Sequence, residues 1–134
     1  MTSVEVCAGA GGQALGLETA GFQHLVLAEL DKDACTTLRL NRPAWNVKNI
    51  DIRDLRASDY RGADLFAGGL PCPPFSVAGK QLGAHDERNL FPVAFELIND
   101  CRPSAVMIEN VRGLLDPRFV SYREWMNAQF EKLG

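Results

Sequence analysis

Short apolar runs alternate with segments of helical periodicity along the chain, and this alternation constrains the fold more than any other feature. The expected strands are Ser3–Cys7, His24–Glu29, Trp45–Ile50, Asp64–Ala67 and Ala105–Ile108. The expected helices are Gln13–Thr19, a segment from Asp31 to just before Pro43, Phe91–Cys101 and Tyr122–Leu133. Alternating strands and helices with apolar strand cores are typical of a parallel sheet covered on both faces. The sequence therefore predicts an α/β fold with a doubly wound, mostly parallel sheet.

Length and composition indicate one globular domain. The chain has 134 residues, of which 46% are hydrophobic and 23% are charged, and this suits a single moderate core. The phenylalanines and leucines on the helices are expected in that core, and His24 is expected to be a packed or edge histidine rather than a ligand. No apolar run approaches the ~20 residues that span a bilayer, and no signal peptide is recognisable. We therefore expect a cytoplasmic protein without a membrane segment.

Charge and cysteine spacing bear on the possible ligands. The formal net charge of -3 gives no electrostatic argument for nucleic acid, because phosphate binding normally needs a basic surface. Contact with DNA or RNA would need local basic loops or a partner. The four cysteines lack the CxxC spacing of a metal site and the density of a disulfide framework. Free thiols and no metal are therefore expected.

The residues that follow the expected strands form a coherent set, because ligands of doubly wound sheets bind outside the carboxyl ends of the strands. The first strand leads into the glycine turn CAGAGG, where missing side chains let a ligand approach the backbone. Glu29 lies close to the ~20-residue spacing after Gly11 at which an acidic residue takes ribose hydroxyls. The later strands are followed by Asp51, Cys72, Glu109 and Asn110. No Lys-Ser or Lys-Thr follows the glycines, so a nucleoside without a triphosphate is favoured.

Cys72 has the placement of a nucleophile. It lies in GGLPCPPFS, after an expected strand and among prolines that stiffen the chain, and loops at strand ends often carry catalytic groups. The alternative is a buried structural thiol, which is the interpretation favoured for Cys7, Cys35 and Cys101. Spacing alone likewise allows Glu109 to be a solvated carboxylate. Position leaves both alternatives open.

The motif GGLPCPPFS, followed by the Glu109-Asn110 pair on this strand and helix pattern, resembles the amino-terminal part of DNA cytosine-5 methyltransferases. The similarity runs from CAGAGG to ENVRGL and includes Asp86, Arg88, Asn89, Leu90 and Phe91. It implies a Rossmann-like, S-adenosylmethionine-dependent methyltransferase fold that is incomplete at its carboxyl end. Residues 1–134 would be the amino-terminal part of the catalytic domain, without a target recognition domain. The implied reaction is methyl transfer from S-adenosylmethionine to carbon 5 of cytosine in DNA, as in restriction-modification systems.

The resemblance also implies a role for each matched residue. Cys72 would be the nucleophile, Glu109 its acidic partner at the base, and Asn110 a support for the loop geometry. Glu29 would contact the donor's ribose and Asp51 its adenine amino group. The implied donor-binding residues are Cys7, Gly9, Gly11, Gly12, Glu29, Leu30, Asp51, Ile52 and Leu90. The expected nucleic-acid-binding residues are Pro73, Ser76, Lys80 and Arg88. Lys80 and Arg88 lie in the glycine-containing, modestly basic segment 77–89, which is expected to close over a nucleic-acid backbone; the alternative is an ordinary solvated loop.

Three departures from the family shape the expectations about partners. Cys7 stands where the family has an aromatic residue, Pro73 follows the nucleophile in place of Gln, and the chain stops before the later strands. Double-stranded DNA with a flipped cytosine is the implied substrate, and a second chain or a carboxyl-terminal segment would supply target recognition. We expect the 134-residue chain alone to bind the donor weakly and to be inactive. The alternatives are a non-catalytic donor-binding or interaction module and cytosine-5 methylation of tRNA.

Overall fold

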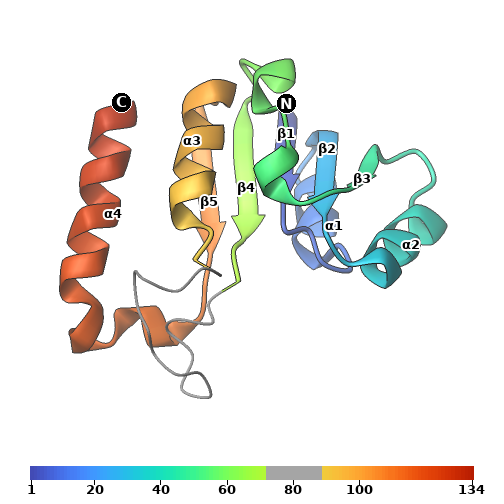
Figure 1. Cartoon of the computed structure of the whole chain (residues 1–134). Helices are drawn as coiled ribbons and strands as arrows, with labels where there is room; N and C mark the ends of the chain where they lie inside the picture. The colour runs from blue at the N-terminus through green and yellow to red at the C-terminus, as the bar shows by residue number, and fades with distance from the viewer. Residues whose placement is uncertain (72–88) are drawn as a thin grey trace.

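The computed structural model describes residues 1–71 and 89–134, and their strands form one parallel sheet (Figure 1). The strands are β1 (Thr2–Val6), β2 (Gln23–Glu29), β3 (Val47–Asn49), β4 (Leu65–Gly69) and β5 (Ala105–Glu109). Their order is β3-β2-β1-β4-β5, and every neighbouring pair is parallel. The direction of winding reverses between β1 and β4, which is where sheets of this kind bind ligands. The predicted fold class is confirmed.

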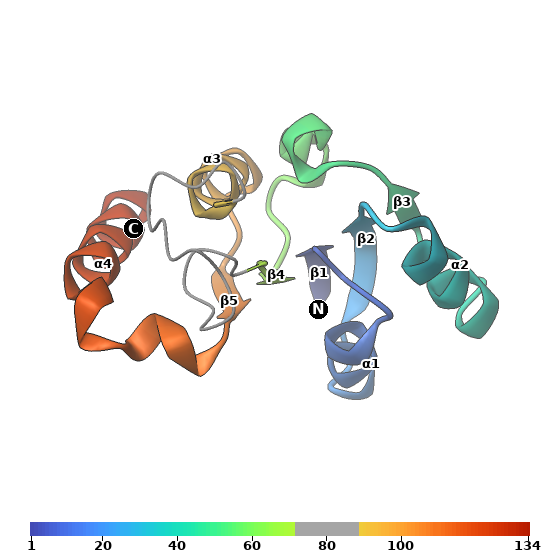
Figure 2. The ribbon, with the colours of Figure 1, turned by 60° about the horizontal axis from the view of Figure 1, so that its bottom comes forward.

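Helices cover both faces of this sheet (Figure 2). They are α1 (Gly12–Thr19), α2 (Lys32–Asn41), α3 (Phe91–Cys101) and α4 (Val120–Leu133). α1 and α2 share one face, where Ala14 and Leu38 pack with Leu27. α3 covers the other face, and α4 packs beside α3 through Phe95 and Trp125, whose ring centroids are 5.5 Å apart. Single-turn helices lie in the connections: η1 (Ile52–Asp54), η2 (Ala57–Tyr60), η4 (Arg112–Leu115) and η5 (Pro117–Phe119).

The larger core lies between the sheet and α3. Its fully buried strand residues are Val4, Val6, Val26, Ala28 and Phe66. Because successive side chains of a strand point to opposite faces, Ser3 and Glu5 of β1 are buried on the α1 side instead. The Ser3 hydroxyl donates to Nδ1 of His24 at 2.8 Å, and Nε2 of His24 donates to the carbonyl of Ala14 at 3.0 Å. His24 is therefore a packed residue that ties β1 and β2 to α1, as predicted.

A local signal in the sequence explains where α2 begins. Asp31 caps α2, since its Oδ1 accepts the backbone N–H of Ala34 at 2.7 Å, as expected for an acidic N-cap.

The expectation that helical leucines are core residues is wrong for Leu15 and Leu40, which are 45% and 75% exposed. Short helices bury only one stripe, and on α2 this stripe consists of Cys35 and Leu38. β3 is also shorter than predicted.

Glycine is required at two positions that shape the sheet edge. Gly11 has φ +93, and a Cβ there would lie 2.5 Å from Cδ2 of Leu38. Gly68 has no room for a side chain either, because its Cβ would lie 2.8 Å from Cγ2 of Val6 on the neighbouring strand. The first glycine lets the turn after β1 lie against α2, and the second lets β1 and β4 approach closely.

Three of the cysteines lie in the described part of the chain, and all three are free thiols: Cys7, Cys35 and Cys101. Cys35 and Cys101 are fully buried, as predicted. Their thiols donate to the carbonyls of Glu29 and Tyr60 at 3.4 and 3.3 Å. Among the described helices, none has the length and apolar character needed to cross a membrane.

Candidate functional site

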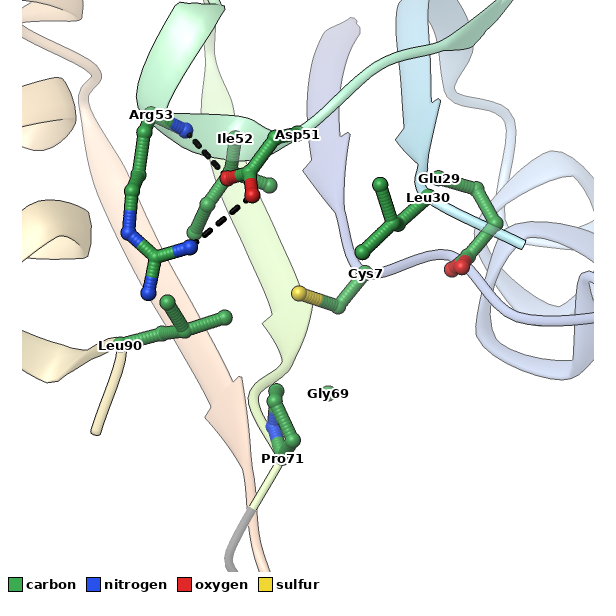
Figure 3. Close-up of a pocket in the computed structure, with 9 residues that line it drawn as sticks. All are labelled: Cys7, Glu29, Leu30, Asp51, Ile52, Arg53, Gly69, Pro71 and Leu90. Carbon is green, nitrogen blue, oxygen red and sulfur yellow. Dashed lines mark hydrogen bonds and ion pairs between the residues drawn. The ribbon is translucent and has the colours of Figure 1, made fainter. Parts of the chain in front are cut away.

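A pocket of about 460 Å³ opens at the carboxyl ends of β1, β2 and β4 (Figure 3). Its volume lies within the range of small-molecule sites. The residues that line it come from separate segments of the chain: Cys7, Glu29, Leu30, Asp51, Ile52, Arg53, Gly69, Pro71 and Leu90. Leu30, Ile52 and Leu90 make its walls apolar, whereas Glu29 and Asp51 supply carboxylates. Such a lining suits a largely apolar ligand with a few hydrogen-bond donors.

Glu29 holds two backbone segments together beneath the pocket. Its Oε2 accepts the N–H of Gly9 at 2.7 Å, and its Oε1 accepts the N–H of Asp31 at 2.8 Å. The same carboxylate therefore fixes the glycine turn after β1 and the start of α2. Since each carboxylate oxygen has more than one acceptor site, Glu29 can still accept a hydrogen bond from a ligand hydroxyl.

Asp51 lies across the pocket from Glu29 and is held by the residue two positions further on. Its Oδ1 accepts the backbone N–H of Arg53 at 2.9 Å, which caps η1, and its Oδ2 accepts the Arg53 guanidinium at 2.9 Å. The Asp51 side chain is 28% exposed. This carboxylate is therefore oriented and accessible from the pocket.

Cys7 brings a protonated thiol into the pocket. Its φ of 53 takes the backbone out of the strand that the sequence predicted to include it, and Figure 3 shows its sulfur pointing toward the space between Asp51 and Leu90. Burial, with a smaller effect of the negative charges on Glu29 and Asp51, raises the pKa of Cys7 to about 12. Since the thiolate is the nucleophilic form, Cys7 is a pocket-lining group and not a nucleophile at neutral pH.

Glu109 reaches the same sheet edge from β5. It pairs in register with Gly69 of β4, and a Cβ built on Gly69 would lie 3.6 Å from Oε2 of Glu109 and 3.9 Å from the carbonyl oxygen of Cys7. The Glu109 carboxylate is thus beside Gly69, which lines the pocket. It is exposed, so it is accessible to a ligand.

Asn110 connects β5 to the segment that leads to Cys72. Its Nδ2 donates to the carbonyl of Leu70 at 3.1 Å, and its Oδ1 accepts the N–H of Val111 at 2.9 Å. Leu70 itself is buried, with 3% exposure. The backbone immediately before Pro71 is therefore anchored both by core packing and by a side-chain amide.

Comparison with known proteins identifies the family. The model of the C-5 cytosine-specific DNA methylases matches residues 1–134. The chain belongs to this family. The Type II methyltransferase M.NgoMIV of Neisseria gonorrhoeae is 62% identical over 133 residues, covering 99% of this chain and 43% of the relative. M.NaeI of Lentzea aerocolonigenes is 52% identical over 134 residues, covering 98% of this chain and 32% of the relative.

A solved structure supports the same family assignment. A protein described as a DNA modification methyltransferase encoded within an Escherichia coli prophage superposes with a TM-score of 0.82 at 25% identity, covering 98% of this chain and 38% of that protein. The resemblance inferred from the motifs is thereby confirmed. The chain spans less than half the length of the curated relatives named above.

The structure brings together much of the predicted donor-binding set. The predicted residues that line the pocket are Cys7, Glu29, Leu30, Asp51, Ile52 and Leu90. Of the predicted glycines, Gly9 is bonded to Glu29, whereas Gly11 and Gly12 belong to the turn and the start of α1. Within the described residues, no group of His, Cys, Asp and Glu side chains could hold a metal ion. The predicted residues outside the described ranges are Cys72, Pro73, Ser76, Lys80 and Arg88.

Sequence reasoning missed three pocket residues: Arg53, Gly69 and Pro71. Gly69 and Pro71 belong to the GGLPCPPFS motif, so their position in the sequence close to Cys72, the predicted nucleophile, was a usable signal. Arg53 follows Asp51 and Ile52 directly, but its contribution depends on the single turn η1, which folds its side chain back onto Asp51.

Proposed function

We propose that this chain is the amino-terminal catalytic part of a DNA cytosine-5 methyltransferase that uses S-adenosylmethionine as methyl donor. The observation that carries the proposal is the pocket at the strand ends, where Glu29 and Asp51 present carboxylates between apolar walls. In a chain of the C-5 cytosine-specific DNA methylase family, this is the natural place for the donor. Since the relatives are more than twice as long, the reaction would also need segments that they carry beyond the matched region.

The pocket residues fit the chemistry of this donor. S-adenosylmethionine carries ribose hydroxyls, an adenine amino group and a positively charged sulfonium, and ionised carboxylates accept hydrogen bonds and balance positive charge. Glu29 would accept from the ribose hydroxyls and Asp51 from the adenine amino group, while Leu30, Ile52 and Leu90 would contact the apolar parts. When bound, the donor supplies an electrophilic methyl group.

The residues of the chain would prepare the cytosine to take that methyl group. Carbon 5 of cytosine is a poor nucleophile, so the Cys72 thiolate would add to carbon 6 and convert the ring into an enamine. Glu109 would hold a proton at nitrogen 3, where negative charge develops. Carbon 5 would then take the methyl group, releasing the sulfonium sulfur as a neutral thioether. Loss of the carbon 5 proton to a base would expel the Cys72 sulfur as thiolate and restore the aromatic ring.

The contacts around β5 support this assignment of roles. The Glu109 carboxylate lies beside Gly69, and Asn110 holds the carbonyl of Leu70 in the chain segment that leads to Cys72. Because the reacting atoms of cytosine lie within a base stack, the DNA would have to present a flipped nucleotide, at a cost of a few kcal/mol.

Calorimetric titration of the 134-residue chain with S-adenosylmethionine tests the donor site. We expect weak but measurable binding by the chain, and a Glu29→Gln variant should bind on the order of tenfold more weakly, because a hydrogen bond to a charged group is lost. Glu131→Gln, on the exposed surface of α4, is the matched control and should bind as the original chain does. Equal affinities of all three proteins would contradict the donor site.

The covalent step needs a separate experiment. The chain would be combined with the carboxyl-terminal segment of the 62%-identical relative and given DNA that contains 5-fluorocytosine, from which the fluorine cannot leave as a proton does. A covalent adduct that is lost in Cys72→Ala and kept in Cys35→Ala would assign the nucleophile. No adduct with the original chain would favour the non-catalytic donor-binding module, and robust methylation by the chain alone would contradict the need for further segments.

A further inference from the structure

Arg53 holds Asp51 through both its backbone and its side chain. Its N–H donates to Oδ1 of Asp51 and its guanidinium donates to Oδ2, each at 2.9 Å. Figure 3 shows the guanidinium between the Asp51 carboxylate and Leu90, on the side of the pocket away from Glu29. Arg53 is therefore part of the wall that a bound ligand would meet.

An ion pair between residues two positions apart on a surface turn normally contributes little to stability. The side chains of Arg53 and Asp51 are 49% and 28% exposed, so a large effect on folding is not expected. The geometry has a different consequence. A free aspartate carboxylate rotates broadly about its last torsion, whereas engagement of both oxygens of Asp51 leaves it one orientation, facing the pocket.

We infer that Arg53 is a positioning residue that sets the preference of the pocket for an adenine base, by fixing the Asp51 carboxylate in the orientation that accepts the exocyclic amine. This inference rests on the proposed function, since it concerns the donor that the pocket would bind. An ionised carboxylate only accepts hydrogen bonds. A purine with a carbonyl in place of the amine would set two acceptors against each other, and polar sites reject such mismatched ligands strongly.

The role of Arg53 depends on pre-organisation, so its removal should affect adenine recognition selectively. Without the guanidinium, only the backbone N–H of residue 53 still holds the carboxylate, through Oδ1. Oδ2 can then turn away from the pocket, and binding must immobilise it again. The hydrogen bond between the adenine amine and Asp51 then becomes weaker. The same rotation also reduces the repulsion between Asp51 and a purine carbonyl. Affinity for the adenine compound should fall while affinity for the carbonyl compound stays constant or rises.

The test compares binding of S-adenosylhomocysteine and S-inosylhomocysteine, which differ in this group, to the 134-residue chain. The original chain should prefer the adenine compound by about tenfold or more. Arg53→Gln should weaken binding of the adenine compound about fivefold and reduce the preference. Arg53→Lys keeps the positive charge and can still donate to Asp51, so it should partly restore both the affinity for the adenine compound and the preference for it. With Asp51→Asn already present, Arg53→Gln should add nothing, because the two residues act as a unit.

Other outcomes overturn the inference in distinguishable ways. If Arg53→Gln lowers the affinity for both compounds by the same factor, the role of Arg53 is merely structural. If it changes neither affinity, Arg53 has no role in recognition. The proposed donor site is unaffected by either outcome. A preference that increases in Arg53→Gln would mean that the guanidinium itself contacts the base. If the original chain binds neither compound, the proposed function and the inference fail together. Equal thermal unfolding midpoints of the variants would show that all of them are folded.

Discussion

The two faces of the central strand β1 differ in kind. On the α3 side, Val4 and Val6 are part of a continuous apolar core. On the α1 side, Ser3 and Glu5 are polar and fully buried. Ser3 is hydrogen-bonded to His24, but neither carboxylate oxygen of Glu5 has a hydrogen-bond partner within the described residues. One face is thus built for stability alone, and the other carries a buried ionisable group.

The buried carboxyl on the α1 side of β1 makes the stability of the fold depend on pH. Burial raises the pKa of Glu5 from 4.5 to about 7, and the amide of Ala14 offsets part of this rise without reaching hydrogen-bond geometry. Glu5 therefore keeps its proton into the neutral range. Since Ala14 of α1 lies beside Glu5, the packing of α1 on this face depends on the protonation of Glu5, whereas Val4 and Val6 on the α3 side carry no ionisable group.

The largest effect is expected from the apolar face. Phe66 in β4 is fully buried, so Phe66→Ala should lower the free energy of unfolding by about 4 kcal/mol through lost burial and a cavity. Leu65 is the preceding residue, on the opposite face of the sheet, and belongs to a small cluster. Leu65→Ala should therefore lower the free energy of unfolding by only about 2 kcal/mol, the low end for such substitutions. Urea unfolding measures both, and equal losses would remove the energetic contrast between the faces.

The next effect is expected from Glu5→Gln and depends on pH. Since one unit of pKa is worth about 1.4 kcal/mol, the difference between 4.5 and about 7 amounts to about 3 kcal/mol. A raised folded pKa gives stability that is fully present below pH 4.5 and is lost as the pH rises through about 7. Relative to Glu5→Gln, the original chain should therefore lose about 3 kcal/mol over this interval.

Unfolding curves from pH 4 to 8 would measure this difference, with Glu124→Gln on the exposed side of α4 as control. The control should keep the pH dependence of the original chain. A Glu5→Gln variant with that same dependence would show that Glu5 titrates normally, and the contrast between the two faces would then lose its electrostatic part.

The smallest effect is expected from Asp31→Ala at the start of α2. Loss of the cap to Ala34 should cost about 1 kcal/mol. The backbone N–H of residue 31, which donates to Glu29, is kept, so donor affinity should stay the same. Thermal unfolding and calorimetry together check this pair of results. A large loss of donor affinity would mean that the cap, and not Glu29 alone, positions the pocket.

The strand and helix order could be predicted because period and capping are local properties. The Asp31 cap, the apolar strands and the Phe91–Cys101 helix all followed from short stretches of sequence. The exposure of Leu15 and Leu40 could not be predicted, because it depends on which stripe of a short helix meets the sheet.

Part of the site required tertiary structure. Strand ends identified Glu29 and Asp51, since parallel strands bring their carboxyl ends to one edge. The left-handed backbone of Cys7 and the return of Arg53 onto Asp51 arise from turn geometry that no sequence period encodes. Glu5 looked like an ordinary strand residue, and its burial became visible only once α1 was placed on β1.

Amide chemical-shift mapping of the isotopically labelled chain, titrated with S-adenosylmethionine, tests directly whether the pocket at the strand ends binds the methyl donor. We expect saturable amide shifts at Gly9, whose N–H donates to Glu29, and at Cys7, Asp51 and Leu90 around the pocket. The amide shifts of α4 should not change. Shifts confined to α4, or no shifts at the pocket when the donor is in large excess, would contradict this expectation.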